Sequence, residues 1–156
     1  MFAAYMWLVA FPNTQYPTDI ISSQLTFSAS TLYSHFKSLI ESGTLDNYIY
    51  FHRIDFIFIV LYTIVLPFTV IVIARLSKDE SNRFWFAVSL LFPAAAVFDF
   101  IENVPMLRML SNPQSFPDWM AIAHSYCALT KLVLFGAGLA LLLVASIILA
   151  VTKIKK

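Results

Sequence analysis

Charged side chains are scarce in this chain: they make up 12% of its 156 residues, whereas 60% of the residues are hydrophobic. An average soluble domain carries about 25% charged residues. A soluble protein of this length also keeps much of its surface in water, and here there is too little polar material to cover that surface. The composition therefore excludes an ordinary soluble globule and predicts an integral membrane protein.

Cysteine, glycine and positive charge are also in short supply, and each shortage excludes a class of site. Cys127 is the only cysteine, so no intramolecular disulfide and no cysteine-based zinc or iron-sulfur site can form. The net charge of +1 argues against nucleic acid as a partner, because phosphate binding needs a concentrated basic surface. Three glycines offer no phosphate-binding loop, and no G-x-S-x-G or H-E-x-x-H motif is present.

Three long apolar runs predict three transmembrane helices, at approximately residues 54–75, 84–103 and 131–152. A helix of about 20 residues spans the roughly 30 Å hydrocarbon core of a bilayer. Residues 1–12 form a shorter apolar run, for which we expect a partial or truncated first span. The predicted fold is all-α, an antiparallel bundle of three full spans and one short N-terminal span, forming a single domain over residues 1–156.

An amphipathic surface helix is predicted over residues 28–42, after the first span. Its apolar residues recur at i, i+4, i+7 and i+8, which places them on one face: Leu32, Phe36, Leu39 and Ile40. Ser28 is expected to cap the start of this helix and Gly43 to end it. A second local pattern, the small residues Gly136, Gly138 and Ala140, predicts a patch where a neighbouring helix packs closely.

The distribution of lysine and arginine predicts the orientation in the membrane. Six of the ten positive residues lie on one predicted side: Arg75, Lys78, Arg83, Lys153, Lys155 and Lys156. Because positive residues concentrate on the cytoplasmic side of transmembrane helices, we expect the C-terminus in the cytoplasm or on the equivalent side of an organelle. The pattern does not indicate which membrane.

Several ionisable residues lie within or beside the predicted spans, where each costs roughly 2.5 to 3.5 kcal/mol at the bilayer centre. Counted from Phe84, Asp99 lies about 22 Å and Glu102 about 27 Å into the bilayer, which is its outer third. The spacing predicts one helical face for Asp99, Glu102 and Asn103. The complete predicted intramembrane polar cluster on the outer side is His52, Arg53, Asp55, Tyr62, Asp99, Glu102, Asn103 and Lys131.

This cluster has two main interpretations. In the first it is a salt-bridge network that holds helices in register, with Arg53 and Lys131 opposite three carboxylates, so that one carboxylate is left over. In the second it is a functional site open to the outer face, because intramembrane acids often mark positions of protons, ions or substrates. The candidate catalytic residues of that site are Asp55, Asp99 and Glu102.

A metal site is a narrower alternative. His52 and Asp55 are spaced i, i+3 and His124 comes from another segment, and these are ligand types that metals accept. His-x-x-Asp arises easily by chance, however, and no histidine lies deep enough in a span to ligate a haem. We therefore expect no metal and no cofactor, with His52 and His124 as weak metal candidates.

Short sequence elements resemble a known family. Pro93–Asn103 reads P-A-A-A-V-F-D-F-I-E-N, residues 55–62 read D-F-I-F-I-V-L-Y, and the pair Thr130 and Lys131 follows. Together these resemble a family of small uncharacterised four-span membrane proteins with a D-x-x-E-N element in the third span. The resemblance covers about residues 20–150 and implies four spans, but it implies no reaction.

The leading functional hypothesis is a non-enzymatic accessory or scaffold-type membrane protein. Its expected partners are the lipid bilayer and, beyond that, other membrane subunits or a second copy of the chain. The alternative is a lipid-modifying or isomerase-type enzyme in which Asp99, Glu102 and Asp55 serve as acid, base and stabiliser of a cationic intermediate. Proton- or cation-coupled transport is disfavoured, because the inner halves of the spans carry no matching acids.

Overall fold

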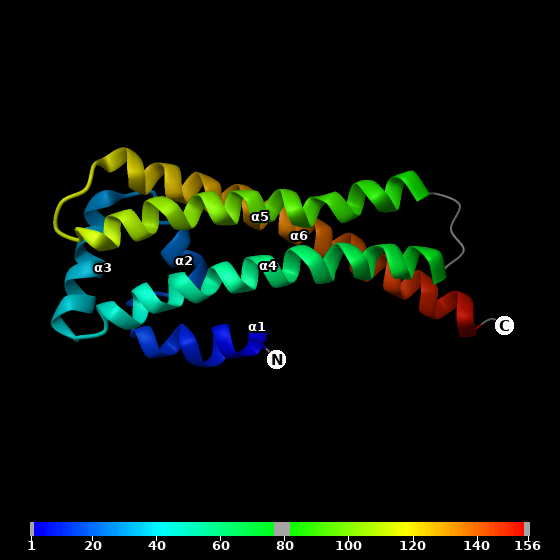
Figure 1. Cartoon of the computed structure of the whole chain (residues 1–156), viewed down its shortest axis with the longest axis horizontal. Coiled ribbons are helices and arrows are strands. Elements are labelled where there is room, and N and C mark those ends of the chain that lie inside the picture. Colours follow the sequence, from blue (N-terminus) through cyan, green and yellow to red (C-terminus); the bar gives the residue numbers. More distant parts are fainter. Residues whose placement is uncertain (1, 77–81, 155–156) are drawn as a thin grey trace. The chain divides into compact units, whose positions relative to one another are not determined.

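The computed structural model describes residues 2–76 and 82–154, and within them all regular secondary structure is helical (Figure 1). The short elements come first: α1 (Phe2–Tyr5), the π-helix η1 (Met6–Ala10), the 3-10 helix η2 (Pro12–Thr14), α2 (Ile20–Gln24) and α3 (Ala29–Glu41). Three long helices follow: α4 (Leu45–Leu76), α5 (Asn82–Ser111) and α6 (Asp118–Ile154).

The three long helices confirm the prediction of three helices long and apolar enough to cross a membrane. Each extends beyond its predicted apolar run, since α4 begins at Leu45, α5 continues to Ser111 and α6 begins at Asp118. Hydropathy marks only the part that lipid would solvate, whereas backbone hydrogen bonding continues through polar residues as well. Of the residues that predicted the orientation, Lys78, Lys155 and Lys156 lie outside the described residues.

The chain divides into two compact units, and each of the long helices contributes to both. The first unit consists of Met1–Ile59 and Phe98–Leu129, and the second of Val60–Val97 and Thr130–Lys156. The first unit therefore holds every short N-terminal element together with one end of each long helix.

The core of the first unit forms around the apolar face of α3. Leu32, Phe36 and Leu39 are fully buried there and share a cluster with Met106 and Met109 of α5. Ile40, the fourth residue of the predicted stripe, is exposed instead. The apolar face of α3 is therefore covered by other side chains of the protein, a packing that the prediction of an amphipathic surface helix did not include.

Both predicted ends of α3 are present. The hydroxyl of Ser28 accepts a hydrogen bond from the backbone N–H of Thr31 at 3.3 Å, which caps the first turn. Gly43 adopts a φ of +70°, which turns the N–H of Thr44 back to the carbonyl of Leu39 at 2.9 Å, while the N–H of Gly43 donates to the carbonyl of Ile40 at 3.1 Å. A side chain at Gly43 would strain this left-handed turn, so glycine stops the helix and sends the chain into α4.

The N-terminal segment is helical and packs along the first part of α4 (Figure 1). Met6 and Ala10 are buried against Phe51 and Ile54 in a second cluster of the first unit. The wider turn of η1 is closed by the N–H of Phe11, which donates to the carbonyl of Met6 at 3.0 Å. The predicted short first span thus corresponds to a helical segment that buries one face on α4.

The second unit has a buried apolar cluster of its own, and it also buries the polar side chains of Ser89 and Lys131. Its buried cluster contains Val70, Ala74, Trp85, Val88, Phe92 and Ala145. Gly138 lies so close to Phe92 that a Cβ atom added to it would be 2.9 Å from the ring, whereas Gly136 has no such neighbour within 4 Å. Of the predicted small-residue patch, Gly138 is buried while Gly136 and Ala140 are exposed.

The two glycines make a matched pair of variants. Gly136→Ala should preserve or raise the melting temperature in detergent, since alanine is about 1 kcal/mol better than glycine in a helix. Gly138→Ala should lower it, because the added methyl group must displace the fully buried ring of Phe92, and overpacking of this kind costs about 1 to 3 kcal/mol. A Gly138→Ala protein as stable as Gly136→Ala would show that this close approach does not exist.

Candidate functional site

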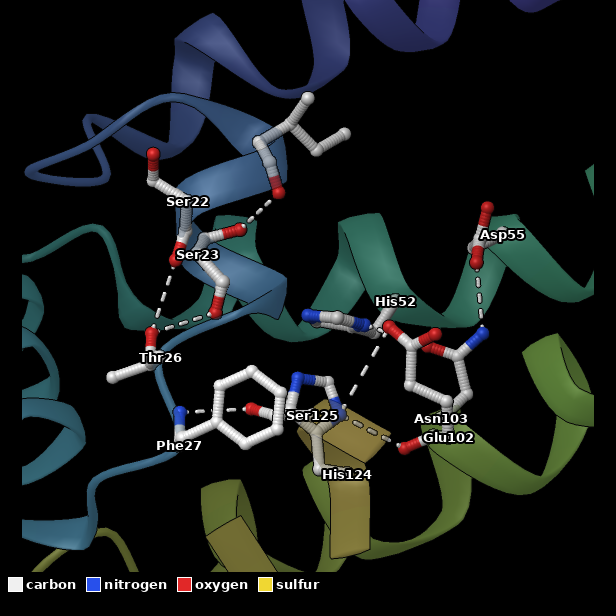
Figure 2. A network of polar contacts seen from close by, with 11 residues as sticks. Ser22, Ser23, Thr26, Phe27, His52, Asp55, Glu102, Asn103, His124 and Ser125 are labelled. Atoms are coloured by element: carbon white, nitrogen blue, oxygen red, sulfur yellow. Dashed lines mark hydrogen bonds and ion pairs between the residues drawn. The ribbon is translucent and has the colours of Figure 1, made fainter. Parts of the chain in front are cut away.

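A buried asparagine connects two polar side chains of α4 in the first unit (Figure 2). The Oδ1 of Asn103 lies 2.8 Å from the Nδ1 of His52, and its Nδ2 donates to the Oδ2 of Asp55 at 2.8 Å. Because an amide oxygen only accepts, the His52 Nδ1 carries the proton in this arrangement. The three side chains therefore form one continuous donor and acceptor chain between α4 and α5.

A carboxyl and an imidazole lie together beside this chain. Glu102 and His124 are both fully buried. The Nδ1 of His124 lies 3.2 Å from the backbone carbonyl of Glu102 and 3.9 Å from its Oε1 (Figure 2). The imidazole N–H thus donates to a carbonyl of α5, and the neighbouring carboxylate completes an ion pair whenever the ring is protonated.

A serine of α6 holds the segment that follows α2. The Oγ of Ser125 accepts a hydrogen bond from the backbone N–H of Phe27 at 3.0 Å. Phe27 has a φ of 50°, in the left-handed region that side chains other than glycine rarely adopt. Its ring packs edge to face on Tyr126, with centroids 5.2 Å apart. These two contacts with α6 hold the unusual backbone of Phe27 in place.

A separate polar contact joins the N-terminal segment to α3. The hydroxyl of Tyr16 lies 3.0 Å from the Nδ1 of His35, and the Tyr16 ring stacks on Tyr48 with centroids 4.6 Å apart. Burial raises the pKa of Tyr16 and lowers the pKa of His35. Both groups are therefore neutral near pH 7, and the bond joins a neutral hydroxyl to a neutral imidazole.

The structure distributes the predicted polar cluster over both units. His52, Asp55, Glu102 and Asn103 lie together in the first unit, and Asp99 is buried one turn before Asn103 on α5. Arg53 is an exposed residue of the first unit. Tyr62 and Lys131 are buried residues of the second unit, where the Tyr62 ring packs edge to face on Phe135.

Two members of the site were not assigned to the predicted cluster. The sequence indicates His124 only as a weak metal candidate and gives no role to Ser125, because both precede the apolar run predicted to begin at 131. The signal that could have found them is the adjacent His-Ser pair, which becomes part of a long helix once α6 is seen to begin at Asp118. Within the described residues, no three His, Cys, Asp or Glu side chains are grouped to hold a metal ion.

No protein-family model, curated protein or solved structure matches this chain. The resemblance to the four-span family therefore stays a prediction.

The role of Asn103 can be tested by removing its amide. Asn103→Leu should destabilise the protein by about 1 to 3 kcal/mol, because buried donors and acceptors lose a partner. In a double-mutant cycle with His52→Phe, the two effects should be non-additive by about 0.5 to 3 kcal/mol in chemical unfolding. Ser111→Ala is the control on the same helix, since this exposed hydroxyl donates to the carbonyl of Arg108, three residues before it. Additive effects of Asn103→Leu and His52→Phe would refute the bridge.

Proposed function

We propose that the chain is a multi-pass integral membrane protein of accessory or scaffold type, in which the buried polar network fastens the helices on the outer side. Membrane insertion is supported by the apolar surface that the long helices present. In their most apolar stretches only 17% of the residues of α4 and 11% of those of α6 are buried. Ile64, Phe68 and Leu143, for example, are 65%, 68% and 62% exposed. Such surfaces aggregate in water but are the normal exterior of a protein in lipid.

The scaffold role is supported by one observation, namely that the described bonds of the network run between different segments. His52 and Asp55 of α4 are joined to Asn103 of α5, and Ser125 of α6 is joined to Phe27. In a bilayer no water competes for these groups, so satisfying them inside the protein orients each helix about its axis. The outward surfaces remain apolar and available to lipid, to other membrane subunits or to a second copy of the chain.

A second candidate function is favoured by the pairing of Glu102 with His124. A fully buried carboxyl 3.9 Å from an imidazole is a proton donor and acceptor pair in apolar surroundings. Shifting a double bond in a lipid requires this chemistry, one proton given and one taken, with a carboxylate to stabilise a cationic intermediate. Asp55 and Asp99 are the carboxylates available nearby for that task. This candidate is a lipid-modifying or isomerase-type enzyme.

A double-mutant cycle on Glu102→Gln and His124→Phe separates the two functions. If the pair is a packing device, each single change should cost about 3 to 5 kcal/mol by leaving its buried partner uncompensated, and the double variant should recover much of the loss. If the pair is catalytic, Glu102→Gln should be as stable as the wild type or more stable, because functional sites hold such groups at a cost to stability. Thermal unfolding in detergent measures the stability of the wild type, of both single variants and of the double variant.

The control for that cycle is Glu41→Gln, which removes an exposed carboxylate 3.8 Å from Lys37 and should leave the melting temperature unchanged. Strong coupling between Glu102 and His124 supports the scaffold. If the two residues are not coupled and the Glu102→Gln variant is more stable than the wild type, the scaffold proposal is contradicted and the enzyme is supported.

Orientation is tested by cysteine labelling in a Cys127→Ala background. A membrane-impermeant thiol reagent should reach a cysteine placed at Ser34, an exposed position of α3, from outside intact cells. A cysteine placed at Ser81, which precedes α5 in the sequence, should react only after permeabilisation. The reverse pattern would move the polar network to the cytoplasmic side.

A further inference from the structure

An apolar groove and a polar pocket adjoin each other on the first unit, between α5 and α6. The groove has a volume of about 780 Å³ and is lined by apolar side chains that include Phe100, Val104 and Ala123. The pocket has a volume of about 360 Å³ and is lined in part by Asn112 and Ser115. The two share four lining residues: Arg108, Ser111, Trp119 and Met120. Together they form one amphipathic site, apolar along its length and polar at its end.

Arg108 gives the polar end its charge. It is the only ionisable side chain other than the thiol of Cys127 that lines either cavity. In the part of the chain that the structure describes, its guanidinium forms no ion pair. An exposed arginine with Ser111, Asn112 and Ser115 beside it offers a planar set of donors and several hydroxyl and amide groups, which suits the oxygens of a phosphate.

The position of this end along α5 fits the boundary between lipid and water. At a rise of about 1.5 Å per residue along the helix, Arg108 lies about 36 Å from Phe84. This is beyond the roughly 30 Å hydrocarbon core and within the headgroup layer. Phe100, at about 24 Å, lies inside the hydrocarbon. Trp119 is 63% exposed beside Arg108, and tryptophan is enriched at the level of the headgroups.

We propose that this site binds one anionic phospholipid, with an acyl chain along the groove and the phosphate on Arg108. The inference rests on the proposed insertion into a membrane. Charge complementarity selects the occupant, since a zwitterionic lipid brings its own cation to the phosphate whereas an anionic lipid leaves its negative charge for Arg108. The groove walls supply apolar contact, and the arginine supplies the preference among lipids.

The test is native mass spectrometry of the full chain in detergent, titrated with phosphatidylglycerol. Wild-type protein should retain one lipid, and Arg108→Gln should bind it about tenfold more weakly, as loss of a charge-assisted hydrogen bond implies. Arg53→Gln is the matched control, because Arg53 is also an exposed arginine of the first unit but lines neither cavity, and it should bind as the wild type does.

A second pair of variants tests the groove. Ala123→Phe should fill the groove and lower retention at least as much as Arg108→Gln does. Ile122→Phe adds a ring to the adjacent exposed position outside the groove and should have no effect. Equal melting temperatures of the two variants will show that both are folded.

Two competitors identify the source of the phosphate. Phosphatidylcholine should displace phosphatidylglycerol poorly, and inorganic phosphate at millimolar concentration should not displace it. Displacement by inorganic phosphate would make the pocket an anion site without a lipid, and Arg108→Gln retaining phosphatidylglycerol as well as the wild type does would also overturn the proposal. Extraction of the wild-type chain from membranes by alkaline carbonate would instead refute membrane insertion, so the two failures are distinguishable.

Discussion

The two hydrogen bonds of the Asn103 side chain are the constraint on which the first unit depends. One amide has one acceptor and one donor end, and it meets the imidazole of His52 and the carboxylate of Asp55 on the same helix. This sets both the rotation and the register of α5 against α4 in that unit, because a slip of one residue would break both bonds. Consecutive helical residues point about 100° apart. With Asn103 turned to α4, Glu102 is turned toward His124 of α6.

Each unit has an apolar cluster of its own. In the first, hydrogen bonds between segments are combined with an apolar core centred on α3, and Ser125 even secures the left-handed backbone of Phe27. In the second, an apolar cluster packs around Phe92, and the absence of a side chain at Gly138 admits the ring of Phe92. Directional bonds specify one arrangement, whereas close packing of small residues depends on shape alone.

One helix serves both the buried network and the proposed lipid site. On α5, Glu102 and Asn103 are buried in the network, while Phe100, Val104 and Arg108 lie on another face and line the groove. A lipid held in the groove would therefore contact the same helix whose rotation Asn103 sets. Under the proposed function the network fixes the helix from inside, and the bilayer contacts it from outside.

Local features of the sequence determined the long helices, the start of α3 at Ser28 and its stop at Gly43, because apolar run length, capping hydroxyls and glycine act within a few residues. The D-x-x-E-N spacing likewise placed Glu102 and Asn103 close together on one helix. Only the tertiary structure decided their partners: His124 lies 22 residues from Glu102, His52 lies 51 from Asn103, and Phe27 lies 98 from Ser125. It also placed Arg53 among the exposed residues and covered α3 with protein side chains. These outcomes depend on how each helix rotates about its axis, and that rotation is set by contacts between segments far apart in the chain.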